Sequence, residues 1–394
     1  MKKAAGLFAV ILIFSSIILS GCSAFKTSTE SKDTIMLNQS WPEETVYIGM
    51  EVFDKTDEQF LKLQEYFEYL TKFFNIKFIY SDTISTAEQE TDFINECVSK
   101  KCKAYIGYYN VTGAESMKKV MDNKIYYWGS EQFYDQFASN PYYLGCYTFI
   151  EDGKSDNGDY QGGYQMGYNL AKKNLKHLFY CAGGALYGIP MFIDRQKGFE
   201  DGVAQAVREG SPTKYDSSAD VIYGWPGTPE FFQAVNQKLT EDYDGAAVSF
   251  NAAAIFQSIY DAHKQNKIKV ATIGEVDDLF YDSIQNGMLS TVVYDCEEVV
   301  FANVMVQILN AVTEHSEATR DKSGKAGKIF AHRWVITDSD TYNKVFDYHD
   351  DGKFFITAED MTTCLASFNP DVDFAKVKDF YASYTLEKAL ESVK

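Results

Sequence analysis

The stretch VYIGMEVFDKTDEQFLKLQEYFEYLTKFFNIKFIY, residues 46–80, carries the pattern that decides the fold. It opens with a short, mostly apolar run at 46–50, of the kind found in a buried strand. Large apolar side chains then recur at alternating spacings of three and four from Phe60 to Phe74, which places them on one face of a helix. A second apolar run follows at 76–80. The stretch therefore predicts a strand, an amphipathic helix and a second strand.

The same alternation fills the rest of the chain, in two series separated by a polar, glycine-containing break at 151–158. Alternation of this kind favours parallel sheets with helices on both faces. We therefore predict an α/β fold with two doubly wound parallel-sheet lobes. The further predicted strands are 104–109, 124–128, 177–181, 219–223, 245–249, 268–273 and 289–293. The further predicted helices are 86–99 with a Ser85 cap, 113–121, 161–174, 193–208, 228–239, 251–265, 276–286 and 297–312.

Composition limits the class of ligand. The formal net charge of −19 argues against nucleic acid and against an anionic membrane surface as partners. Aromatic residues make up 15% of the chain, and aromatic faces suit sugars and flat heterocycles equally well. Composition therefore favours a small ligand that is not strongly acidic.

The N-terminus has the pattern of an export signal. Met1-Lys2-Lys3 is followed by a short apolar run and then by Leu19-Ser20-Gly21-Cys22, a tetrad that resembles the bacterial lipobox. The resemblance implies a signal peptide at 1–21 and lipidation of Cys22, followed by a polar tether at 22–44. An ordinary cleaved signal with a chance cysteine is the alternative. With lipidation, the mature protein is expected on the extracytoplasmic face of the cell membrane, held by its lipid anchor.

Neither metal nor catalytic motifs stand out. Six cysteines follow Cys22, and Cys97 and Cys102 are close enough in sequence to pair if a helix ends between them. No Cys-x-x-Cys spacing, no Gly-x-Ser-x-Gly elbow and no nucleotide-binding glycine motif occurs. We expect no enzyme activity, no metal and no cofactor.

The expected architecture places the ligand site before any family is considered. In open parallel sheets the crevice lies beyond the carboxyl ends of the strands. The candidate ligand-binding residues at those ends, or in the loops that follow them, are Phe53, Asp54, Glu131, Gln132, Tyr187, Trp225, Asn251, Glu275 and Tyr294.

Two motifs and one strand end connect this pattern to a known family. Gly158-Asp159-Tyr160-Gln161-Gly162-Gly163, and later Asp194-Arg195-Gln196-Lys197-Gly198-Phe199, resemble the start of the second lobe in type I periplasmic sugar-binding proteins of the ribose- and galactose-binding kind. Ser249-Phe250-Asn251 falls where the family often has a ligand-binding asparagine. Members of that family close two hinged lobes around one small molecule and deliver it to an ABC importer, and in Gram-positive bacteria they are commonly lipoproteins.

The resemblance implies domain boundaries. Residues 45–148 and 296–331 would form the first lobe, and residues 149–295 and 332–394 the second, with the chain crossing a hinge near 147–151, 294–296 and 332–337. The tail, 342–394, extends beyond the simplest sugar binders as two or three helical stretches. It would pack on the second lobe or reach a partner.

The resemblance adds Asp159 and Arg195 to the candidate ligand-binding residues, and Phe60 is added as an aromatic residue of the helix after the first strand. Each candidate has a functional and a structural interpretation. Arg195 can clamp vicinal hydroxyls or a carboxylate, or pair with a nearby surface acid. Asn251 can bind a hydroxyl or cap its helix. Asp159 and Glu131 can accept from sugar hydroxyls or serve as loop charges. The aromatic candidates can stack on a sugar or fill a local core, and for Phe60 that core is its own helix.

Some positions depart from the family pattern. Glu131-Gln132 stands where many sugar binders have Asp-Arg, and Gly274-Glu275 where a ligand aspartate is common. The leading hypothesis is a membrane-anchored receptor that hands a sugar, or a related polar solute, to an ABC permease. Docking on a sensor histidine kinase is a second hypothesis, and a non-sugar ligand such as a nucleoside is a third.

Overall fold

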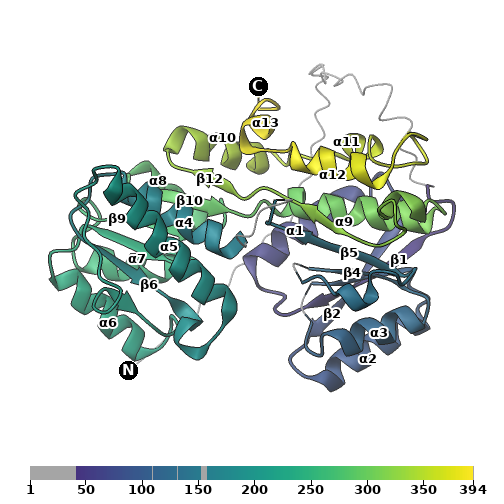
Figure 1. Ribbon diagram of the computed structural model, residues 1–394, viewed down its shortest axis with the longest axis horizontal. Helices are drawn as coiled ribbons and strands as arrows, with labels where there is room; N and C mark the ends of the chain where they lie inside the picture. The colour runs from purple at the N-terminus through teal and green to yellow at the C-terminus, as the bar shows by residue number, and fades with distance from the viewer. Residues whose placement is uncertain (1–40, 109, 131, 152–157, 394) are drawn as a thin grey trace, which may run out of the picture. The chain divides into compact units, whose positions relative to one another are not determined.

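The computed structural model describes residues 41–108, 110–130, 132–151 and 158–393. Their strands form two six-stranded sheets, each with helices on both faces (Figure 1). This confirms the predicted α/β fold with two parallel-sheet lobes. The predictions for residues 1–40, including the signal peptide and Cys22, lie outside the described residues, as does Glu131. No helix of the described ranges has the length and apolar character needed to cross a membrane.

The first sheet has the strand order β11-β5-β4-β3-β1-β2, and every neighbouring pair is parallel. Its strands are β1 (Val46–Val52), β2 (Ile76–Thr83), β3 (Ala104–Gly107), β4 (Tyr126–Gly129), β5 (Tyr143–Thr148) and β11 (Lys328–Phe330). Its helices are α1 (Glu58–Leu70), α2 (Ala87–Ser99), α3 (Ala114–Asp122) and α9 (Glu297–Val312), with short 3-10 turns η1 (Asp135–Phe137) and η3 (Ser316–Thr319). Helices α2 and α3 pack together on one face (Figure 1).

The second sheet has the order β12-β10-β9-β8-β6-β7, parallel except for β12, which runs antiparallel to β10. Its strands are β6 (Leu178–Cys181), β7 (Val221–Ile222), β8 (Gly245–Val248), β9 (Lys269–Ile273), β10 (Leu289–Tyr294) and β12 (Trp334–Ile336). Its helices are α4 (Gly158–Ala171), α5 (Pro190–Arg208), α6 (Pro229–Thr240), α7 (Ala253–Asp261) and α8 (Asp278–Gln285), with the 3-10 turn η2 (Gly183–Tyr187).

The predicted helical periodicity is seen directly in the packing of α1. Phe60, Leu63, Phe67 and Leu70 are all buried in the core of the first lobe. The start of α2 differs by one residue from the predicted Ser85 cap, because Thr86 and Gln89 form a reciprocal capping box. The thiols of Cys97 and Cys102 are both free, so the pairing left open by their spacing is not made.

The glycines of the two motifs let α4 and α5 pack backbone against backbone. A Cβ atom on Gly163 would overlap the Arg195 carbonyl oxygen, and one on Gly198 would overlap the Tyr160 carbonyl oxygen. Since only glycine fits at both crossing points, these residues fix where the first half of α5 lies. Arg195 is carried on that half.

Gly198→Ala is therefore expected to destabilise the protein by about 1–3 kcal/mol, the usual range for an overpacked interior. The obstacle is backbone rather than a flexible side chain, which favours the upper end of that range. Denaturant unfolding would measure the loss. Arg208→Ala, at an exposed position of the same helix, serves as control and should change stability by less than about 0.5 kcal/mol. Equal stabilities for the two variants would show that α4 and α5 can separate without penalty.

The C-terminal tail contains α10 (Ser339–Asp350), α11 (Ala358–Thr362), α12 (Phe374–Ala382) and α13 (Leu386–Leu390). Helix α10 packs against α8 of the second lobe, but α12 packs against β11 and α9 of the first. The expected assignment of all of 332–394 to the second lobe thus fits only its first part. The physical reason is an apolar contact: Phe374 lies so close to Gly327 that a Cβ there would be 2.7 Å from its ring.

Candidate functional site

A cavity of about 530 Å³ opens where the strands of the second sheet end and the β1–α1 loop of the first lobe approaches them. Its volume is in the range of small-molecule sites. The lining residues are Thr56, Asp57, Gln59, Met191, Arg195, Phe250, Asn251, Ile273, Gly274, Glu275, Leu279 and Asp295. Polar groups from both lobes thus face one space.

Arg195 is held by two hydrogen bonds. Its Nε donates to Asp159 Oδ1 at 2.8 Å, and its Nη1 donates to the Ser249 carbonyl oxygen at 2.8 Å. The side chain is largely buried and lies over the ring of Phe192. Its Nη2 group makes no hydrogen bond to any described residue, so a fixed donor remains for a ligand.

Asn251 lies at the carboxyl end of β8. Its Oδ1 accepts from the Ala253 backbone N–H at 2.9 Å, while the N-cap position of α7 itself is occupied by Ala252. The side-chain oxygen therefore orients the amide, and its NH₂ group can donate to a ligand. The capping and ligand roles considered for this residue are compatible.

Glu275 is the most buried acid among the residues that line the cavity. Glu275 is 8% exposed, and its Oε2 has no hydrogen-bond partner among the described residues. Burial raises the pKa of Glu275 to about 8; Lys62 opposes this shift, and the neighbouring Asp295 and Asp277 add to it. Burial also raises the pKa of Glu297, which accepts a hydrogen bond from Gln59. A ligand hydroxyl or ammonium group would satisfy the free oxygen of Glu275.

The raised pKa of Glu275 predicts a pH dependence of stability. In the unfolded chain a glutamate titrates near about 4.3, so between about 4.3 and about 8 the folded state binds more protons than the unfolded state. Stability should therefore fall as pH rises through this window and level off above about 8. Glu275→Gln should flatten that slope, measured by denaturant unfolding from pH 5 to 9. The exposed Glu317→Gln should leave it unchanged, and an unaltered slope in Glu275→Gln would contradict the assignment.

Arg333 joins the segments that connect the two lobes. Its Nε and Nη2 donate to the two oxygens of Asp295 at 2.7 and 3.1 Å, and its Nη1 donates to the Gly158 carbonyl oxygen and, at 3.5 Å, to Asp159. Its guanidinium lies 4.1 Å from the centre of the Phe149 ring. Phe149, Asp295 and Arg333 lie on the three successive hinge segments. Asp159 accepts hydrogen bonds from both Arg195 and Arg333, so it connects this hinge contact to the cavity.

The twelve predicted site residues lie in different environments in the structure. Arg195, Asn251 and Glu275 line the cavity, and Asp159 supports Arg195. Phe60 and Tyr294 are buried side chains, packed at 5.4 Å on Tyr80 and at 6.0 Å on Trp334.

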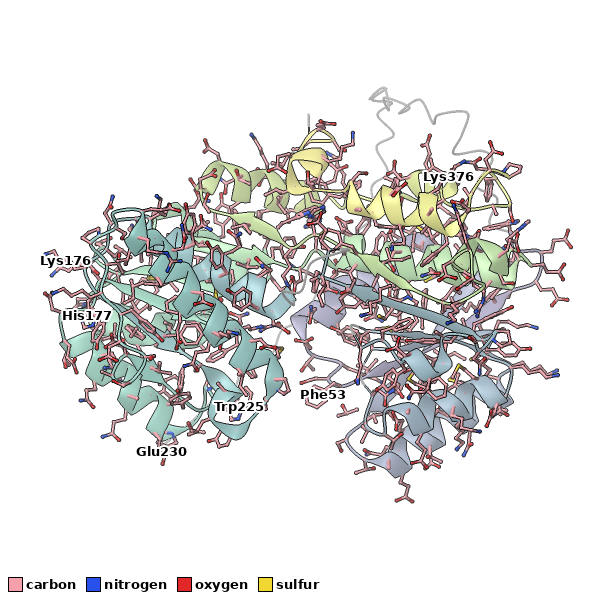
Figure 2. The ribbon with its side chains drawn as sticks, in the orientation of Figure 1. Phe53, Lys176, His177, Trp225, Glu230 and Lys376 are labelled. Atoms are coloured by element: carbon pink, nitrogen blue, oxygen red, sulfur yellow. The ribbon has the colours of Figure 1, made fainter. Side chains whose placement is uncertain are left out.

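The remaining described candidates lie on the surface of their lobes. Phe53, Tyr187 and Trp225 are 52%, 64% and 40% exposed. Figure 2 labels Phe53 on the first lobe and Trp225 on the second, each at the edge of its lobe next to the other lobe. The exposed Asp54 accepts from Thr56, and the exposed Gln132 accepts from the Tyr134 hydroxyl.

Sequence reasoning missed several lining residues. Asp295 and Phe250 each stand next to a named candidate, so widening each strand end by one residue would have found them. Asp57 and Gln59 lie at the start of α1, several residues after the end of β1. A search limited to strand ends therefore does not find them. Arg333 follows no local pattern, because its partners come from distant segments.

Comparison with known proteins gives the fold but no close relative. No family model and no curated protein matches the sequence. Among solved structures, an ABC transporter solute-binding protein from Bacillus halodurans C-125 with bound myo-inositol has a TM-score of 0.58 at 14% identity, covering 77% of this chain and 98% of its own. One from Actinobacillus succinogenes 130z with bound D-allose has a TM-score of 0.56 at 14% identity, covering 76% and 99%.

A third similar structure contains two proteins. It is a complex of XylFII with LytSN, with a TM-score of 0.53 at 14% identity, covering 75% of this chain and 99% of that chain. These likenesses show that the chain has the fold of type I periplasmic binding proteins, which confirms the resemblance drawn from the motifs at the level of the fold.

Proposed function

We propose that this protein is an extracytoplasmic solute-binding lipoprotein that captures a sugar or related small polar solute and delivers it to an ABC permease. The observation that carries the proposal is the cavity in which Arg195 and Asn251 of one lobe face Asp57 and Gln59 of the other. A ligand bonded to both lobes stabilises the arrangement in which they are close, and the free form is the one that opens. The two fold neighbours with bound myo-inositol and D-allose support a polyhydroxylated ligand.

The chemistry of the cavity fits binding rather than catalysis. Its fixed donors are those of Arg195 and Asn251, and its acceptors are carboxylates, so a hydroxyl that donates and accepts can be held on both sides. Its arginine is already paired with Asp159, so a strongly anionic ligand has little uncompensated positive charge to bind. We accordingly propose no enzyme activity for this site.

The test is thermal unfolding of the purified protein against monosaccharides, polyols, oligosaccharides and nucleosides. A ligand at a hundred times its dissociation constant should stabilise the protein by about 2.7 kcal/mol. Asn251→Ala and Arg195→Ala should lose the shift, whereas Arg208→Ala, at an exposed position of the helix that carries Arg195, should keep it. A shift that survives both cavity substitutions would place the ligand elsewhere. A shift given only by nucleosides would support the non-sugar alternative.

The lipid anchor is tested separately, by the mass of the mature N-terminus and by cell fractionation. The wild-type chain should begin at an acylated Cys22 and fractionate with the membrane. Cys22→Ala should remain unacylated and leave the membrane fraction after cleavage or stay as an uncleaved precursor. A mature chain that begins elsewhere, with no acyl mass, would contradict this half of the proposal.

A sensing role is the second candidate, since the XylFII fold neighbour is found in a complex with LytSN. In that case the ligand-bound form would dock on the extracellular domain of a sensor histidine kinase instead of a permease. Both outputs use the same cavity. Uptake of the identified ligand by cells that lack the protein would separate them, because a transport receptor is required for uptake and a sensor is required only for the response.

A further inference from the structure

Cys296, Glu298 and His349 meet outside the ligand cavity, although they come from three different parts of the fold. Cys296 is the N-cap residue of α9 and ends the second hinge segment, and Glu298 lies in the first turn of that helix. His349 lies in the last turn of α10, in the C-terminal tail. One potential ligand atom from each residue lies within 4.8 Å of the other two.

The distances are close to those of a coordination shell. Cys296 Sγ is 3.6 Å from Glu298 Oε1, and His349 Nε2 is 2.8 Å from the same oxygen. In a tetrahedral site with bonds of about 2.0–2.3 Å, ligand atoms lie about 3.3–3.7 Å apart. The separation of His349 Nε2 and Glu298 Oε1 would have to widen by about half an ångström to reach this range. The His349 side chain is 22% exposed at a helix end.

A buried carboxylate oxygen supplies an independent reason to place a cation here. Glu298 is 3% exposed, and its Oε2 has no hydrogen-bond partner among the described residues. An unpaired buried oxygen of this kind is costly. Lys62, which lines the adjoining cavity, donates to the Val276 carbonyl oxygen at 2.5 Å.

There is also room for a fourth ligand. Glu298 and His349 line a cavity of about 90 Å³, together with Tyr294 and Glu297. A water molecule occupies about 30 Å³ in the liquid, so the cavity can hold one next to the metal.

We propose that Cys296, Glu298 and His349 bind a divalent transition-metal ion of the zinc type, with water as the fourth ligand. One sulfur, one nitrogen and one oxygen donor are the ligand types that Zn²⁺ accepts, whereas Mg²⁺ and Ca²⁺ favour oxygen alone. Binding releases the thiol proton of Cys296 to solvent. Because one ligand is on a hinge segment and another on the tail, the metal fastens α10 to the hinge.

The absence of a Cys-x-x-Cys motif argued against a zinc site, but it does not exclude a site whose ligands are far apart in sequence. His349 is separated from Glu298 by 51 positions, so no local motif could show it. The site shares no residue with the lining of the sugar cavity, and its test does not depend on the proposed transport function.

The experiment is a titration of the metal-free full chain with Co²⁺, read by absorption, followed by competition with Zn²⁺. Wild type should bind one Co²⁺ with a thiolate-to-cobalt charge-transfer band and visible bands of tetrahedral intensity, all displaced by Zn²⁺. His349→Gln and Cys296→Ala should each weaken binding by roughly 100-fold or more, since even outer-shell partners are worth about 10- to 100-fold. The matched controls Cys364→Ala and His315→Gln, at a buried thiol and a half-exposed imidazole elsewhere, should keep wild-type affinity.

His349→Gln is the decisive variant because its partly exposed side chain can be changed without emptying the core. Near-ultraviolet circular dichroism would verify that each variant retains native packing. Absence of a thiolate band in folded wild type, even with excess Co²⁺, would overturn the proposal, as would wild-type Co²⁺ affinity in Cys296→Ala or His349→Gln.

Discussion

Removal of residues 351–394 is expected to prevent stable folding. The segment supplies side chains that are 0–2% exposed, namely Phe355, Ile356, Met361, Leu365, Val377 and Tyr381. Full burial of each such side chain contributes about 1.5–3 kcal/mol, so their combined loss is comparable to the whole stability of a typical domain, about 5–15 kcal/mol. Residues 351–394 are therefore part of the hydrophobic core of the protein.

Its hydrogen bonds lead to the same expectation. Asn310 of α9 donates to the Cys364 carbonyl oxygen at 2.9 Å and accepts from the Ala366 N–H at 2.8 Å, and the Tyr66 hydroxyl donates to the Ile356 carbonyl oxygen at 3.0 Å. Truncation would leave the buried Asn310 amide without either partner, which adds about 1–3 kcal/mol.

Thermal unfolding monitored by circular dichroism would measure the effect. A chain ending at Glu391 is the control and should unfold at the wild-type temperature, because the described residues that it lacks, Ser392 and Val393, are exposed or half-exposed. A chain ending at Asp350 with a wild-type transition would contradict the packing described here. Loss of transport by the truncated chain would therefore reflect its failure to fold and would not identify a partner surface on the tail.

A partner surface on the tail is better tested by reversing one exposed charge. Figure 2 shows Lys376 on the outer side of α12, where its side chain is exposed. Lys376→Glu should leave the unfolding temperature unchanged and reduce import only if that face contacts another protein.

Periodicity was sufficient to predict the elements that carry long apolar faces. The apolar spacing from Phe60 to Leu70 matches a helix whose four large side chains are all buried. The edge strands β11 and β12 were not predicted, because each is only three residues long and its pairing partner is distant in sequence. Strands this short give no alternation to detect.

The candidate site was predicted only in part. Strand ends and motif positions located Arg195, Asn251 and Glu275, because the carboxyl ends of parallel strands meet at one edge. The same reasoning could not give the exposure of a loop ring such as Tyr187, which is 64% exposed in this structure. Nor could it decide whether Phe60 lies in the core or faces a ligand, because the apolar spacing of α1 is the same in both cases.

Arg333→Ala is expected to destabilise the protein by about 3–5 kcal/mol and to weaken ligand binding at the same time. The substitution leaves Asp295 without its bidentate partner, and the side chains of Asp295 and Asp159 are only 17% and 14% exposed. Breaking a buried ion pair from one side has a cost of this size because the remaining charge is left uncompensated. Ligand binding should weaken because Asp295 lines the cavity and Asp159 positions Arg195.

A double-mutant cycle with Asp295→Ala isolates the interaction. The double variant should be more stable than the sum of the two single losses predicts, by more than about 1 kcal/mol, because each single variant leaves the other charge unpaired. Arg333→Lys should fall between wild type and Arg333→Ala, since lysine keeps the charge but cannot bond both oxygens of Asp295 or stack its planar group on Phe149. Additive losses in denaturant unfolding would show that Arg333 acts through packing alone. A non-additive cycle together with weakened binding would identify the hinge arginine as the residue that couples lobe connection to the ligand site.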